Sequence, residues 1–126
     1  MLQIPMESAL NLLRILASTD LIGRLFLAPY SIGPDTLASD LTEISWPGYS
    51  GIGLGNPNFA IIDDVARVTW DDLSWTNPGS RVEIGGWNIT TTDRLFLLCG
   101  ESLPTSLSTG ASYIFTPRFS LIPIFK

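Results

Sequence analysis

Histidine is absent from this 126-residue sequence, and cysteine occurs once, as Cys99. Without histidine the chain cannot build a Ser-His or Cys-His nucleophile pair or a His-ligated metal site. One thiol cannot form an internal disulfide and is too few for a thiolate zinc site. Within the apolar run RLFLLCGE, the expected role of Cys99 is that of a small buried side chain. We therefore expect no metal and no cofactor, and carboxylates remain the main candidates for reactive groups.

Charged residues are also scarce. They make up 15% of the chain, against about 25% in a typical soluble domain. Hydrophobic residues account for 45%, and nine prolines and eleven glycines interrupt them. So few charged residues cannot coat the whole surface of a monomer. We therefore expect some apolar surface to be covered by other chains. This composition predicts a single turn-rich β domain that forms an oligomer.

Positive charge is the scarcest. Lysine occurs once, at Lys126, the six arginines are scattered singly, and the net charge is −5. Nucleic-acid binding needs clustered cations, and an anionic membrane would repel such a chain. No apolar run approaches the roughly 20 residues of a membrane-spanning helix, and the N-terminus lacks the basic region of a secretory signal. We expect a soluble protein with neither nucleic acid nor membrane as a partner.

One helix signal stands at the start, in IPMESALNLLRILAS. Pro5 suits the opening of a helix, and Glu7 in the first turn suits the positive end of its dipole. Leu12 and Ile15 lie off the apolar face, so the helix is apolar on more than one side. It is expected either to lie across a sheet edge or to pack against a neighbouring subunit. The apolar face at helical spacing comprises Met6, Ala9, Leu10, Leu13, Leu16 and Ala17.

From Leu21 onward the pattern changes to short strands separated by Pro, Gly, Asn and Ser turns. In VARVTWDDLSWT the apolar positions change parity at Asp71-Asp72, and in RVEIGGWNITTT they change at Gly85-Gly86. An extra residue in a strand flips its faces in this way, so both sites are predicted β-bulges. The expected fold is mainly β: a jelly-roll-like β-sandwich over residues 21–126, preceded by an N-terminal helical arm at residues 1–20.

Two later runs have signatures of their own. DRLFLLCGESL is apolar at consecutive positions, as in a central strand with both faces buried. SYIFTPRFSLIPIF carries Pro117 and Pro123, which cannot donate to a ladder. These prolines predict an edge strand or a strand broken by bends.

Four glycines, Gly48, Gly51, Gly53 and Gly55, crowd into GYSGIGLGNPN and raise the question of a phosphate-binding loop. Such a loop needs Gly-Lys-Ser/Thr at its end, or a helix directly after it. No lysine follows, and Asn56-Pro57-Asn58 is a turn sequence. The interpretation that remains is a strand in which glycines permit bends or close backbone approach.

The carboxylates Asp63-Asp64 and Asp71-Asp72 are adjacent pairs. Neighbouring residues on a strand point to opposite faces, so neither pair makes a paired-acid site by itself. A glycosidase could combine one acid from each pair about 5 to 10 Å apart, with Trp70, Trp75 or Trp87 as a wall for stacking sugars. In short strands these tryptophans are expected instead to anchor the core or an interface. We therefore predict that the protein is not an enzyme.

Several runs together resemble small structural proteins of tailed bacteriophages. They are RLFLAPY, LASDLTEISWPGYSGIGL and GGWNITTTDRLFLLCGES, followed by a final hydrophobic strand. Trp46 and Trp87 depart from the family pattern, in which phenylalanine and tyrosine are common at those two positions. The matching positions are Leu25, Phe26, Ala38, Asp40, Leu41, Thr42, Glu43, Pro47, Gly48 and Tyr49, and later Gly86, Trp87, Thr90, Leu95 and Glu101.

The resemblance implies a virion component with a β-sandwich fold and no catalytic residues. It makes Gly48-Tyr49 a structural corner, in which the glycine turns the chain and the tyrosine hydroxyl finds a partner. The leading hypothesis is a capsid cement or decoration protein. It would be a homotrimer on the capsid surface that clamps the major capsid protein, and it would be present in the host cytoplasm during assembly. Residues 1–18 and 113–126 are the expected contact arms. The residues expected in interface or structural roles are Met6, Leu10, Leu13, Leu16, Trp46, Gly48, Tyr49, Trp87, Tyr113 and Phe125.

Three alternatives remain. A tail or neck adaptor, or a fibre-associated protein, would be a different part of the virion. A carbohydrate-binding β-sandwich would use an exposed Trp75 or Trp87 as a stacking platform. A two-carboxylate hydrolase would depend on Asp64 and Asp72.

Overall fold

The computed structural model describes residues 5–94 and 96–121, and its fold is mainly β, with 46% strand and 13% helix. The predicted class, a β-sandwich-like fold with one N-terminal helix, is confirmed. The elements are α1 (Met6–Ala17), β1 (Leu21–Leu27), the short 3-10 helix η1 (Ala38–Asp40), β2 (Ile52–Gly53), β3 (Asn58–Ile62), β4 (Val65–Thr69), β5 (Leu73–Thr76), β6 (Val82–Thr91), β7 (Leu97–Leu107), β8 (Ser112–Phe115) and β9 (Arg118–Leu121).

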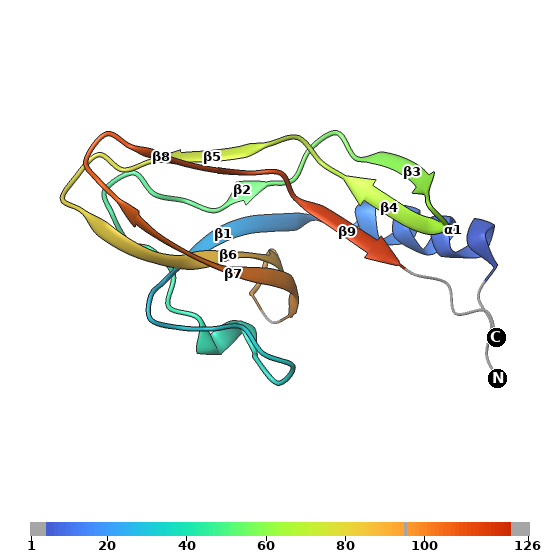
Figure 1. The fold of residues 1–126 in the computed structure, drawn as a ribbon, viewed down its shortest axis with the longest axis horizontal. Coiled ribbons are helices and arrows are strands. Elements are labelled where there is room, and N and C mark those ends of the chain that lie inside the picture. The colour runs from blue at the N-terminus through green and yellow to red at the C-terminus, as the bar shows by residue number, and fades with distance from the viewer. Residues whose placement is uncertain (1–4, 95, 122–126) are drawn as a thin grey trace.

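The strands form three antiparallel sheets. One sheet has four strands in the order β2-β1-β6-β7, a second has three in the order β3-β4-β9, and the third pairs β5 with β8. Figure 1 shows an elongated molecule, with the four-stranded sheet and the β5–β8 pair at one end and β3, β4, β9 and α1 at the other. Because β4 leads into β5 and β8 leads into β9, two long bent stretches of chain connect the two ends.

Aromatic rings fill the space between the four-stranded sheet and the β5–β8 pair. Phe115 on β8 stacks on Trp87 of β6, with ring centroids 4.4 Å apart, and on Trp75 of β5 at 5.6 Å. Trp75 and Trp87 are 5% and 7% exposed. The prediction that these tryptophans anchor the core is confirmed. The alternative in which Trp75 or Trp87 forms an exposed platform for sugars is wrong, because packing covers both rings.

The predicted bulge at Gly85-Gly86 is present. The pairing of β6 with β7 shifts register between Ile84 and Gly86. Gly86 has a φ of +155°, and a Cβ at this position would collide with the backbone carbonyl of Glu101. Glycine is therefore required here both by the backbone angle and by the close approach of the neighbouring strand.

The parity change at Asp71-Asp72 also has a structural counterpart. The chain advances four residues from Thr69 to Leu73, whereas the opposite chain advances three from Arg118 to Phe115. One extra residue therefore lies in the connection between β4 and β5. As a bulge does, it reverses which side chains face the core.

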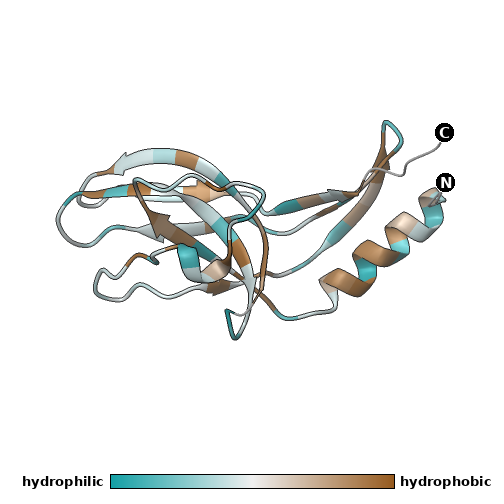
Figure 2. Ribbon diagram, turned by 90° about the horizontal axis from the view of Figure 1, so that it is seen from below, coloured by the Kyte–Doolittle hydropathy of each residue, from teal (hydrophilic) through white to brown (hydrophobic). Residues whose placement is uncertain are grey.

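The helix α1 covers one face of the sheet β3-β4-β9. Its buried side chains are Ala9, Leu10 and Leu13, and it contacts all three strands. Figure 2 shows the hydrophobic segments of this helix beside the sheet. The helix thus lies over the face of a sheet in its own chain rather than across a sheet edge. Leu12 and Ile15, on its outer side, are 48% and 66% exposed, so this side is what remains for a neighbouring chain.

The strand β7 corrects one prediction. It was expected to be central, but it is an edge strand of the four-stranded sheet. A loop contacts the middle of this strand: Ile32 donates its backbone N–H to the Ser102 hydroxyl at 2.8 Å, and its side chain lies against Gly100. Phe96 and Leu103, from the same apolar run, are 68% and 46% exposed.

The C-terminal strands agree with their prolines. The chain breaks at Thr116-Pro117 between β8 and β9, and β9 lies at the edge of its sheet. Pro123 lies outside the described residues.

Candidate functional site

The residues Trp46-Pro47-Gly48-Tyr49 form a tight turn at the surface. The Tyr49 N–H donates to the Trp46 carbonyl at 3.0 Å, and Gly48 has a φ of +81°. Proline at the second position and a positive φ at the third define a type II turn, which selects glycine there. The predicted Gly48-Tyr49 corner is therefore present, and glycine is needed for its backbone angle.

The Tyr49 hydroxyl joins this turn to the four-stranded sheet. It accepts a hydrogen bond from the Leu25 N–H at 3.1 Å and donates one to Glu43 Oε2 at 2.8 Å. Burial raises the pKa of Tyr49 well above its usual range, and Glu43 raises it further, while the Leu25 bond opposes the shift. The tyrosine therefore stays neutral, and its hydroxyl holds the turn against the sheet through these two hydrogen bonds.

Glu43 is the centre of a half-buried ionic cluster. Its carboxylate pairs with Arg24 Nη1 at 3.0 Å and with Arg94 Nη1 at 3.5 Å. Arg24 also donates from Nε to the Thr90 hydroxyl at 3.1 Å. The cluster ties the segment before the turn to β1, β6 and the loop after β6. Sequence analysis missed it, although an arginine in the middle of the apolar strand LIGRLFL signals a buried partner.

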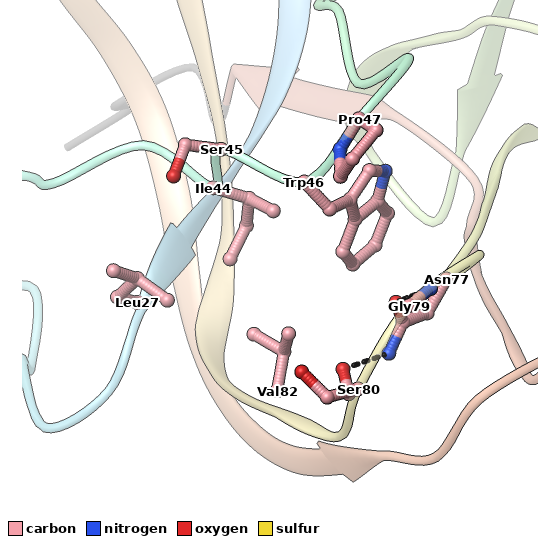
Figure 3. A pocket seen from close by; sticks show the side chains of 9 residues that line it. All are labelled: Leu27, Ile44, Ser45, Trp46, Pro47, Asn77, Gly79, Ser80 and Val82. Carbon is pink, nitrogen blue, oxygen red and sulfur yellow. Dashed lines mark hydrogen bonds between the residues drawn. The ribbon is translucent and has the colours of Figure 1, made fainter.

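A cavity of about 350 Å³ lies beside this turn (Figure 3). Trp46 and Pro47 form one wall, and the indole ring of Trp46 extends into the space. The apolar floor consists of Leu27, Ile44 and Val82. The opposite wall is the loop between β5 and β6, which contributes Asn77, Gly79 and Ser80, and Ser45 completes the rim.

Asn77 holds the opposite wall in place. Its side chain is completely buried. Its Nδ2 donates to the carbonyls of Ser80 and Leu107 at 2.9 and 3.0 Å, and its Oδ1 accepts from the Gly79 N–H at 3.0 Å. Sequence analysis did not single out this residue, although TNPGS is a turn sequence in which asparagine commonly bonds nearby backbone.

The two acid pairs lie apart. Asp63 and Asp64 form the two-residue turn between β3 and β4, with φ values of 51° and 60°, as a type I′ hairpin requires. Asp71 accepts from Asn56 Nδ2 at 2.6 Å, and Asp72 accepts from the Thr116 hydroxyl. The five residues of β4 and Trp70 separate the pairs, and β4 alone spans about 16 Å. This exceeds the separation needed by a two-carboxylate hydrolase, so Asp64 and Asp72 do not form the predicted alternative site.

Large apolar side chains are exposed at both ends of the molecule. Ile15 on α1 is 66% exposed, Ile114 on β8 is 61% exposed, and Phe96 before β7 is 68% exposed. Others of this kind are Leu12, Leu37, Ile61, Ile62 and Leu103. Burying such side chains against another chain is favourable, so they are the structure's candidates for contact residues.

The residues expected in interface or structural roles divide into four groups. Leu10, Leu13, Trp87 and Tyr113 are buried in the chain's own core, which suits the structural role and leaves them no surface for a partner. Phe125 lies outside the described residues. The partly buried residues are Met6, Leu16, Trp46 and Tyr49, and Gly48 is exposed in its turn.

The helix α1 has 12 residues, too few to span a bilayer, and no other α-helix occurs within residues 5–94 and 96–121. Comparisons of the chain with protein-family models, with curated proteins and with solved structures found no match. The resemblance to bacteriophage structural proteins therefore stays a prediction from the sequence.

Proposed function

We propose that this chain is a structural protein of a tailed-bacteriophage particle, and that it decorates the assembled head as a homotrimer bound to the major capsid protein. The observation that carries the proposal is the exposure of large apolar side chains at both ends of an elongated molecule. Ile15 and Ile114 are 66% and 61% exposed although each lies on a regular element. Two separated contact surfaces suit a protein that bridges neighbouring subunits.

The energetics favour binding through several copies at once. Burying one large aliphatic side chain contributes about 1.5–3 kcal/mol, so one such contact gives weak binding. A trimer presents three copies of each contact, and linked contacts raise the overall affinity without any new interaction. A protein that binds only the assembled shell then stabilises that shell over its free subunits.

The sequence supports the same proposal independently. The run LASDLTEISWPGYSGIGL carries the strongest part of the resemblance to virion structural proteins. In the structure this run contains η1, Glu43 with its ionic cluster, and the Gly48-Tyr49 corner. All of these residues stabilise the fold, so they suit a rigid structural component.

Co-sedimentation with undecorated capsids tests the proposal. Wild-type protein is expected to pellet with capsids, and light scattering is expected to give three times the 13.8 kDa chain mass. Ile15→Ser should weaken capsid binding by at least about tenfold, since each trimer loses three contacts. Ser8→Asn, a polar exchange on the same helix, is the matched control and should bind normally.

Two results would contradict the head assignment. If the wild-type protein stays in the supernatant as a monomer, both the proposed binding to capsids and the proposed trimer are wrong. A ring-shaped oligomer that ignores capsids would favour the tail or neck alternative instead.

A further inference from the structure

We infer that the cavity beside Trp46 is a binding site for a single sugar ring, with an N-acetylated hexose as its best occupant. This site goes beyond the proposed head contacts and does not depend on them, because it involves none of the exposed apolar residues on α1 and β8. Its volume of about 350 Å³ falls at the lower end of the range for ligand pockets, about 300 to 1,000 Å³. Such a space holds one ring rather than a chain of rings.

The aromatic wall is prepared before any ligand arrives. Trp46 packs edge-on against Tyr49, with ring centroids 5.8 Å apart. Tyr49 is in turn held by hydrogen bonds to Glu43 and to the backbone of Leu25. A wall fixed in this way loses little conformational freedom on binding, which favours affinity.

The opposite wall is fixed independently. The completely buried Asn77 uses both amide hydrogens and its carbonyl oxygen on the backbone of Ser80, Leu107 and Gly79. These bonds set the position of Ser80 across the cavity from Trp46 (Figure 3). The two walls belong to different loops, so the width of the cavity is set by two separate hydrogen-bond networks.

Polar groups around the cavity are left without partners in the protein. Among the described residues, the hydroxyls of Ser45 and Ser80 and the indole N–H of Trp46 make no hydrogen bond. The Ser80 hydroxyl lies beside the apolar floor of Leu27, Ile44 and Val82, whereas the Ser45 hydroxyl and the Trp46 indole nitrogen lie on the outer side of the cavity wall (Figure 3). An aromatic wall, a free hydroxyl and an apolar floor match a sugar. Its C–H face can contact the indole, a sugar hydroxyl can exchange a hydrogen bond with Ser80, and an N-acetyl methyl can rest on the floor.

Trp46 is also the tryptophan that remains accessible. Trp70, Trp75 and Trp87 are 3%, 5% and 7% exposed, whereas Trp46 is only partly buried. A sugar in the cavity must therefore change the signal of Trp46 and leave the three core tryptophans nearly unchanged. This difference gives the inference a site-specific readout.

The test is a titration of the full ¹⁵N-labelled chain followed by NMR of the indole N–H groups, with Trp46→Phe used to assign the Trp46 signal. The probes are N-acetylglucosamine, glucose and the disaccharide chitobiose. N-acetylglucosamine should shift the Trp46 signal saturably, with a dissociation constant of about 1 mM, and glucose should bind more weakly because it lacks the methyl group. Chitobiose tests whether the natural ligand is the terminal ring of a glycan or a free monosaccharide. Binding equal to or tighter than that of N-acetylglucosamine indicates the terminal ring of a glycan, and loss of binding indicates a free monosaccharide.

Variants test the proposed contacts. Trp46→Ala and Ser80→Ala should each weaken binding by about tenfold, measured on the backbone N–H signal of Gly79, because Trp46→Ala removes the indole signal. Ser80 is exposed, so its replacement keeps the test valid even if Trp46→Ala disturbs the turn. Ser74→Ala, on the exposed face of β5, is the matched control and should bind like wild type. The inference is overturned if no probe gives a saturable shift up to about 100 mM, or if Trp46→Ala and Ser80→Ala bind as the wild type does.

Discussion

The Tyr49 hydroxyl donates a 2.8 Å hydrogen bond to Glu43 Oε2 while accepting one from the Leu25 N–H. The Tyr49 hydroxyl thereby connects the turn, the ionic cluster and strand β1 of the four-stranded sheet. Because Glu43 also pairs with Arg24 and Arg94, the segment from η1 to Tyr49 is held at several points. The position of Trp46 and of the cavity beside it follows from this attachment.

Removal of the Tyr49 hydroxyl should destabilise the fold. Tyr49→Phe leaves the Leu25 N–H and one Glu43 oxygen without this partner, which should cost about 1 to 3 kcal/mol of unfolding free energy. Urea denaturation measures the loss. Tyr30→Phe is the matched control, because the Tyr30 hydroxyl has only a 3.5 Å contact with Thr36, and its effect should stay within about 0.5 kcal/mol. Equal stability of the two variants would show that the Tyr49 bonds contribute nothing.

The turn at Gly48 should not accept a side chain without strain. Gly48→Ala places a Cβ at a φ of +81°, and the expected cost is about 1 kcal/mol. Space is not the cause, because a Cβ there would have no neighbour within 4 Å. Gly55→Ala meets equally open space without a positive φ, so it should be neutral or slightly stabilising. Thermal denaturation of both variants checks the difference, and a neutral Gly48→Ala would refute the type II turn.

The Tyr113 hydroxyl is buried and has no hydrogen-bond partner among the described residues. Burial raises the pKa of Tyr113 to about 12, with a further contribution from the charge of Glu101. Removal of an unpaired buried hydroxyl takes away a desolvation cost, so Tyr113→Phe should be neutral or stabilising by up to about 1 kcal/mol. The denaturation midpoint in urea measures it. A clear destabilisation would mean that the hydroxyl has a partner in solution, such as an ordered water.

Cys99 should react slowly with thiol reagents in the folded protein. Burial raises the pKa of the Cys99 thiol to about 11, and the reactive species is the thiolate. At pH 8 the thiolate fraction would be about one in a thousand, against roughly a quarter for an exposed cysteine. Because its pKa is raised, the Cys99 thiol stays mostly neutral below pH 11. The rate of its reaction in the folded protein should therefore rise through pH 9 to 11. A colorimetric thiol assay with and without urea checks this, and equal rates in both conditions would contradict it.

Local sequence patterns determined a large part of this structure. The spacing of Ala9, Leu10 and Leu13 placed the helix and its buried face. The parity changes at Asp71-Asp72 and Gly85-Gly86 located both irregularities in the strands. These features depend on the periods of helices and strands and on the angles that glycine allows, and such properties belong to a few consecutive residues.

The tertiary structure decided what depends on residues far apart in the chain. β7 begins with consecutive apolar residues yet lies at an edge of its sheet, where the loop carrying Ile32 contacts Gly100 and Ser102. Arg24, Glu43 and Arg94 come from three separate segments, and the cavity is formed by two loops about thirty residues apart. No local pattern encodes which strands pair or which loops meet, because these contacts form only when the whole chain buries its apolar surface at once.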